Sequence, residues 1–120
     1  MKTEVIDTGK IRVLDIKADN GIVLKSAEDA LDILANAGYG YEINKIIIRR
    51  ENIIPDFFDL KTKIAGDILQ KFSTYNGYLA IIGDFADIQS KSLHDFIRES
   101  NKQGRILFKP TITEALEIFG

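Results

Sequence analysis

The sequence predicts an α/β protein with a mixed, mostly parallel sheet of about five strands, an N-terminal antiparallel hairpin and four helices. Two observations predict this class. Three short apolar runs, at 46–48, 79–82 and 106–108, are continuous rather than alternating, which is typical of strands buried on both faces. Between these runs the apolar residues recur with helical spacing, and strands that alternate with helices form parallel sheets through right-handed crossovers.

The first part of the chain predicts the hairpin and the first helix. Residues 4–6 and 11–16 are extended runs around a turn at 7–10, and Asn20-Gly21 marks a second turn before a short extended piece at 22–24. A helical stripe follows, with Ser26 as its N-cap. The segment Gly38-Tyr39-Gly40 predicts that this helix stops near Gly38 and continues as a turn.

The remaining elements alternate regularly. We expect strands at 45–48, 78–82 and 105–108, since each is apolar and bounded by turn residues. The helices between and after them are predicted by three apolar stripes: Ile64, Ala65, Ile68 and Phe72; Leu93, Phe96, Ile97 and Ser100; and Ile112, Ala115, Leu116 and Phe119. Ile47 and Ile81 should be almost fully buried on adjacent parallel strands.

Composition excludes several function classes. The 120 residues are 45% apolar and 28% charged, which predicts one globular domain over 1–120. The absence of cysteine excludes disulfides and thiolate chemistry, and a single histidine excludes a multi-histidine metal site within one chain. A net charge of −2 gives no footprint for nucleic acid. No secretory signal or membrane-length apolar run is present, so we expect a cytoplasmic protein that does not bind membranes.

The order of hairpin, helix, strand, helix, strand, helix, strand and helix resembles the STAS domains, the fold of sulfate transporters and anti-sigma-factor antagonists. The strand Lys45-Ile46-Ile47-Ile48 and the stripe from Ile64 to Phe72 are similar to the STAS central strand and phosphoacceptor helix. The resemblance covers nearly the whole chain and implies a single STAS-like domain that acts by protein–protein contact.

A second resemblance is to a small prokaryotic family of unknown function, of the DUF4180 type. Five segments carry it: Asp56-Phe57-Phe58-Asp59-Leu60-Lys61-Thr62, Ala65-Gly66-Asp67-Ile68-Leu69-Gln70-Lys71-Phe72, Gly83-Asp84-Phe85, Ser90-Lys91-Ser92-Leu93-His94-Asp95-Phe96-Ile97 and Glu99-Ser100-Asn101. This family implies no activity. STAS antagonists carry an Asp-Ser-Ser-Gly type segment at the start of their second helix, where a serine is phosphorylated. Here the matching stretch is Leu60-Lys61-Thr62-Lys63, so we predict no serine-kinase switch at this helix.

The candidate site lies where the parallel strands end, because open parallel sheets bind ligands outside the carboxyl ends of their strands. Ser90 or Ser92 should open the third helix, whose free N–H groups favour an anion. We assign no catalytic residue, metal or cofactor. The predicted binding face consists of Arg49, Asp56, Phe58, Asp59, Lys61, Thr62, Asp84, Phe85, Ser90 and Lys91.

Several of these residues have two interpretations. Asp56, Asp59 and Asp84 could share a divalent cation, but capping by Asp56 or Asp59 and a turn at Asp84 are favoured. A solvated surface role is favoured over a general base for His94. Phe57, Phe58 and Phe85 either form an exposed partner patch or lie under a loop that folds over them.

Two functions follow. The favoured one is a non-enzymatic binding or regulatory module that acts on a protein partner or by self-association. The alternative is a small-ligand or nucleotide-binding domain, which could be an enzyme, at the same strand-end face, using the corner formed by Arg49 or Arg50, Lys61, Asp84 and Ser90. A concave pocket with converging polar groups would favour the alternative, whereas a flat apolar face would favour the module.

Overall fold

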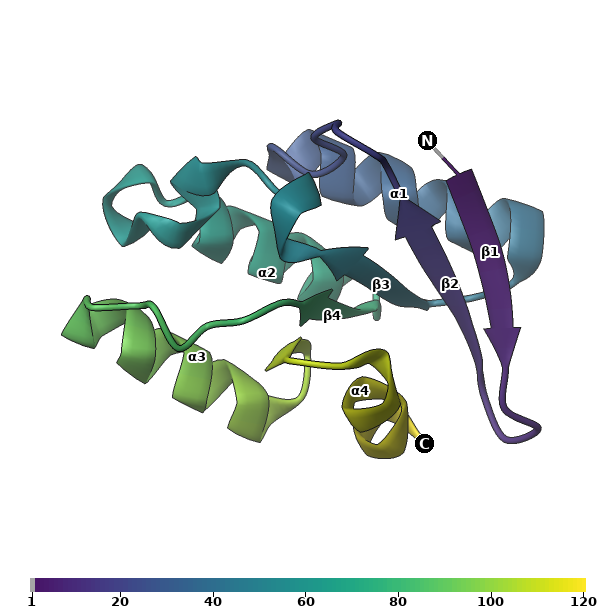
Figure 1. The fold of residues 1–120 in the computed structure, drawn as a ribbon. Helices are drawn as coiled ribbons and strands as arrows, with labels where there is room; N and C mark the ends of the chain where they lie inside the picture. The colour runs from purple at the N-terminus through teal and green to yellow at the C-terminus, as the bar shows by residue number, and fades with distance from the viewer. Residues whose placement is uncertain (1) are drawn as a thin grey trace.

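The computed structural model describes residues 2–120, which form a five-stranded mixed sheet and four α-helices (Figure 1). The strands lie in chain order: β1 (Lys2–Asp7), β2 (Arg12–Lys17), β3 (Lys45–Arg49), β4 (Tyr78–Ile82) and β5 (Ile106–Lys109). β1 and β2 form an antiparallel hairpin, and every other neighbouring pair is parallel. The predicted fold class is confirmed.

The two faces of the sheet carry separate cores. On one face the strands pack against α1 (Ala27–Tyr41), α2 (Ile64–Thr74) and α3 (Lys91–Gln103). On the other, a smaller core that includes Ile47 packs against α4 (Ile112–Phe119). This follows from the strand order, because right-handed crossovers that all advance in one direction place their helices on one face. In Figure 1 the ribbon of α1 passes behind β1 and β2.

The central strands are buried as the sequence predicts. Ile47 on β3 and Ile81 on β4 are both 0% exposed, and the two strands pair in parallel. Continuous apolar runs therefore did indicate strands covered on both faces.

The end of α1 differs from the prediction. The helix runs through Gly38 and ends at Tyr41, and the left-handed residue is Glu42, with a φ of 57°. The N–H groups of Glu42 and Ile43 donate to the carbonyls of Gly38 and Ala37, and Ile43 is buried. The left-handed Glu42, bonded to the carbonyl four residues back and followed by the buried Ile43, ends the helix with an αL-type cap, so the glycine pattern was misleading.

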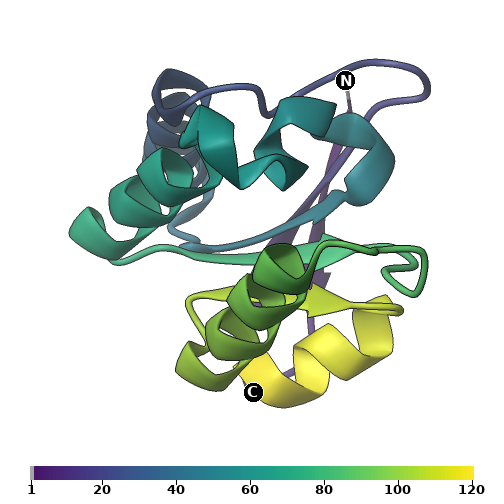
Figure 2. The same ribbon diagram turned by 90° about the vertical axis from the view of Figure 1, so that its left-hand side faces the viewer.

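The segment between β3 and α2 also differs. Capping by Asp56 or Asp59 would start the second helix at one of these residues, but three 3₁₀ turns follow β3 instead, at Arg50–Asn52, Pro55–Phe58 and Leu60–Thr62 (Figure 2). Pro55 opens the second turn, and Lys63 adopts a left-handed conformation with a φ of 66° before α2 starts at Ile64. That residue interrupts the helical path and separates the last turn from α2.

Candidate functional site

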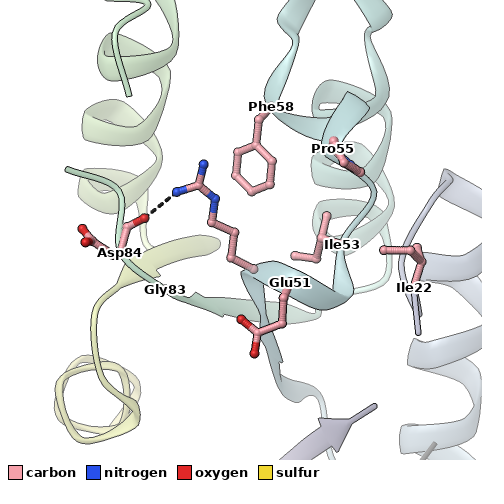
Figure 3. A pocket seen from close by; sticks show the side chains of 8 residues that line it. Ile22, Glu51, Ile53, Pro55, Phe58, Gly83 and Asp84 are labelled. Carbon is pink, nitrogen blue, oxygen red and sulfur yellow. Dashed lines mark hydrogen bonds between the residues drawn. The ribbon is translucent and has the colours of Figure 1, made fainter. Parts of the chain in front are cut away.

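A pocket of about 400 Å³ lies beside the carboxyl ends of β3 and β4. It is open to solvent, and it lies where an open parallel sheet places ligands. We call it the strand-end pocket. Its walls come from the loop before α1, the first two 3₁₀ turns and the loop after β4 (Figure 3), and its lining residues are Ile22, Arg50, Glu51, Ile53, Pro55, Phe58, Gly83 and Asp84.

Arg50 is the central side chain of the strand-end pocket. Its Nη1 donates to the backbone carbonyl of Asp84 and, at 2.9 Å, to Oδ1 of Asp87. Its guanidinium carbon lies 5.1 Å from the ring centre of Phe58 and 5.3 Å from that of Phe85. Two cation–π contacts and two hydrogen bonds fix the plane of the guanidinium.

Gly83 makes this arrangement possible. A Cβ at position 83 would lie 2.8 Å from Cβ of Arg50, closer than two such carbons approach. Because the crowded atom belongs to the stem of Arg50 and not to its flexible end, a larger residue at 83 would displace the whole side chain. The turn after β4 therefore requires glycine for contact and not for a left-handed φ.

Asn52 holds the opposite wall. It is 1% exposed, and its Nδ2 donates to the carbonyls of Ala18 and Gly21 at 2.8 and 2.9 Å. The backbone carbonyl of Asn52 accepts hydrogen bonds from the N–H groups of Val23 and Leu24. These bonds anchor the loop that carries Ile22 into the pocket wall. The sequence places Asn52 just after β3, but the predicted binding face did not include it; the signal was a polar residue directly before the buried apolar residue Ile53.

The three phenylalanines divide between core and surface. Phe57 is fully buried, while Phe58 and Phe85 are half-buried and pack on the core from its edge. The ring centres of Phe57 and Phe58 are 5.0 Å apart, and those of Phe58 and Phe85 are 6.2 Å apart. The 3₁₀ turns thus cover one ring, and Arg50 lies over the other two.

Arg49 lies away from this pocket. It shares a face of the sheet with Ile47, since alternate residues of a strand point the same way, and that face is the one covered by α4. There its guanidinium bonds both carboxylate oxygens of Asp15, at 2.5 and 3.1 Å, and these bonds raise the pKa of Arg49. Asp15 is 2% exposed. The pair is a buried salt bridge that sequence reasoning did not find.

The predicted residues from 56 to 62 lie in the 3₁₀ turns. Asp56, Asp59 and Lys61 are exposed, and Oδ1 of Asp59 accepts from the N–H of Lys61. The hydroxyl of Thr62 donates to the carbonyls of Asp56 and Asp59, at 2.7 and 2.8 Å. Within residues 2–120, no three acidic or histidine side chains are grouped as metal ligands. The bond to Lys61 makes Asp59 the cap of the third 3₁₀ turn, whereas α2 itself starts without a side-chain cap.

The start of α3 uses its own polar residues. Oγ of Ser90 accepts from the N–H of Leu93, so Ser90 is the N-cap, and Lys91 pairs with Asp95 at 2.9 Å. Oδ1 of Asp84 accepts from the N–H of Ala86 and forms a turn. Of the ten predicted residues, the strand-end pocket brings together Phe58 and Asp84, with Phe85 behind Arg50.

His94 is exposed, and a ring nitrogen lies 2.5 Å from the carbonyl of Ile88. The clear pKa shifts of acidic groups belong to exposed ion pairs: hydrogen bonds from Lys17, Arg50 and Lys91 lower the pKa of Glu4, Asp87 and Asp95, respectively. An ion pair on the protein surface explains each of these pKa shifts, so the shifts do not indicate a catalytic acid or base.

Comparison with known proteins gives one result. Residues 8–118 match the family model described as "Domain of unknown function (DUF4180)". The chain belongs to this family. No curated protein and no solved structure matches it significantly. Across residues 2–120, none of the helices has the length and apolar character needed to span a bilayer.

Proposed function

We propose that this DUF4180 chain is a single STAS-like, cytoplasmic domain that acts as a non-enzymatic binding module, and that the strand-end pocket is where its protein partner docks. The observation that carries the proposal is the immobilised Arg50, which stands beside an apolar wall formed by Ile22, Ile53 and Phe58. A rigid cationic group next to exposed apolar surface is a common arrangement at the centre of protein interfaces.

The exposure of Ile22 supports the same function. This side chain is 44% exposed although its loop is anchored by Asn52, so the loop holds an isoleucine at the surface. The phosphorylation switch of STAS antagonists is not part of the proposal. The Thr62 hydroxyl already donates to two backbone carbonyls, and that position is held by the turn.

The experiment compares complexes purified from the native cells. Ile22→Glu places a charge on the pocket wall, and Ile118→Glu is the matched control, because Ile118 is 50% exposed on α4, which covers the other face of the sheet. We expect Ile22→Glu to lose a stoichiometric protein partner that Ile118→Glu retains, with both variants melting like the native protein. Equal retention by the two variants would place the docking surface elsewhere.

One observation favours the alternative, a small-ligand domain: the strand-end pocket is concave and not flat. Only Arg50 brings a charged group toward its apolar wall, whereas the carboxylates of Glu51 and Asp84 point away from Phe58 (Figure 3). A thermal-shift screen of nucleotides and small organic acids tests this function. A saturable rise in melting temperature that Ile22→Glu abolishes would support the alternative.

A further inference from the structure

We propose that the strand-end pocket binds the carboxyl terminus of a polypeptide whose last residue is aliphatic, with the carboxylate on Arg50 and the side chain on the apolar wall. This inference rests on the proposed function and specifies the chemistry that the pocket recognises. It depends on the geometry of one guanidinium, on the carboxylate that already contacts it, and on the distribution of charge around it.

The guanidinium of Arg50 uses one of its nitrogens within the chain. Nη1 donates to Asp87 and to the carbonyl of Asp84, and no residue among 2–120 accepts a hydrogen bond from Nε or Nη2. The side chain keeps 30% exposure, and the rings of Phe58 and Phe85 hold its plane. The edge of the planar guanidinium that carries Nε and Nη2 therefore remains available, and its geometry matches the two oxygens of a carboxylate. A lysine ammonium could not make this paired contact.

Asp87 shows that the guanidinium of Arg50 binds a carboxylate. Its carboxylate already lies 2.9 Å from Nη1, and the hydrogen bond from Arg50 lowers the pKa of Asp87. The Asp87 side chain is 70% exposed, so this is a surface ion pair and a weak one. An incoming carboxylate can displace Asp87 or share the guanidinium with it, at little cost to the fold.

The wall beside Arg50 defines the rest of the ligand. Phe58 lies against the guanidinium, and Pro55, Ile53 and Ile22 continue the apolar lining from there toward the loop before α1 (Figure 3). A terminal residue carries its carboxylate and its side chain on one Cα, so an aliphatic C-terminal residue can reach Arg50 and the wall together. Burial of its side chain against Ile22 removes apolar surface from water on both molecules.

The surrounding charge selects a single negative charge. Arg50 is the one cation among the lining residues, whereas Glu51 and Asp84 line the same pocket and Asp87 adjoins it. The excess of acidic over basic residues at the pocket repels a phosphate, which carries nearly two charges at neutral pH, more strongly than a carboxylate, which carries one. Nucleotides and phosphopeptides are therefore disfavoured as ligands.

The experiment is a titration of the isotope-labelled full chain, followed by amide chemical shifts. The probes are the peptide acetyl-Ala-Ala-Leu with a free carboxylate, its C-terminal amide, 4-methylpentanoate and inorganic phosphate. We expect the free peptide to shift the amides of Glu51, Gly83 and Asp84 saturably. The amide should bind at least about tenfold more weakly, because it lacks the charge-assisted bonds to Arg50.

Two variants test the role of the guanidinium. Arg50→Gln should remove the preference for the free peptide over its amide. Asp87→Asn should strengthen binding of the free peptide about two- to fivefold, the factor expected from removal of an exposed competing ion pair. Asp95→Asn is the matched control, because Asp95 is also an exposed partner of basic side chains, on α3, and it should change nothing.

The outcomes separate this inference from the proposed function. Equal binding of peptide and amide, tighter binding of phosphate, or no effect of Asp87→Asn would overturn the carboxylate site. A partner lost by Ile22→Glu in cells would still support the docking function. If 4-methylpentanoate binds as tightly as the peptide, the polypeptide terminus is wrong as the ligand. No saturable shift from any probe would overturn the inference, whereas the partner comparison would decide the proposed function by itself.

Discussion

The buried pair of Asp15 and Arg49 makes a sharp prediction, because its two members differ in exposure. The Asp15 side chain is 3% exposed and that of Arg49 is 24% exposed. Removal of Arg49 leaves a carboxylate that cannot reach water, whereas removal of Asp15 leaves a guanidinium that can. Arg49→Met should therefore destabilise the protein more than Asp15→Asn does, although each substitution removes one charge of the same pair.

The magnitudes follow from the geometry. Loss of one partner of a fully buried pair costs about 3–5 kcal/mol. Lys17 Nζ still lies 3.9 Å from Asp15, so we expect Arg49→Met to lower the free energy of unfolding by about 2–4 kcal/mol. Asp15→Asn keeps one acceptor for Arg49 and should cost about 1–2 kcal/mol. A double change, Asp15→Leu with Arg49→Met, should be closer to the native stability than Arg49→Met alone.

Urea denaturation followed by far-UV circular dichroism measures these differences. Arg49→Met should retain every partner, because Arg49 lies on the α4 face. Equal costs for Arg49→Met and Asp15→Asn would refute the reasoning from burial. A folded Arg49→Met protein that loses its partner would assign Arg49 to the binding face.

Three further predictions concern stability. In Gly77→Ala the new Cβ would lie 2.3 Å from Cδ2 of Leu34, so we expect denaturation to show a loss of about 1–3 kcal/mol, and an unchanged midpoint would contradict the contact. Ser90→Ala should cost about 1 kcal/mol through the lost N-cap, while its neighbour Ser92→Ala should leave thermal unfolding unchanged; equal effects would show that Ser90 is not the cap. Ion pairing lowers the pKa of three exposed carboxyl groups in the folded protein. Such groups stabilise the folded state at a pH above their pKa in the unfolded chain, and this contribution is lost as they become protonated. The free energy of unfolding should therefore fall as the pH drops below about 4, and the fall should be smaller in high salt. A flat acid limb would argue against these pairs, which involve Glu4, Asp87 and Asp95.

Periodicity was sufficient for the elements but not for their ends. The continuous apolar runs placed Ile47 and Ile81 in buried parallel strands, because only a strand covered on both faces can be apolar at every position. The end of α1 was set by the buried Ile43, which takes part in a tertiary contact that glycine positions do not encode. The left-handed Lys63 was equally hidden, since nothing in its residue type favours a positive φ.

The strand-end location of the pocket followed from the sequence, since β3 and β4 were recognisable and parallel strands end at one edge of the sheet. The sequence did not predict which of the two adjacent arginines, Arg49 or Arg50, lines the pocket. Arg49 is the last residue of β3 and points to the α4 face with Ile47, while Arg50 begins a 3₁₀ turn and reaches the loop after β4. Successive side chains of a strand point to opposite faces of the sheet. The exact residue at which β3 ends therefore decides which arginine reaches the pocket. Asn52 and Asp87 entered the site only through bonds to segments more than 30 residues away, and a single sequence does not specify contacts of that range.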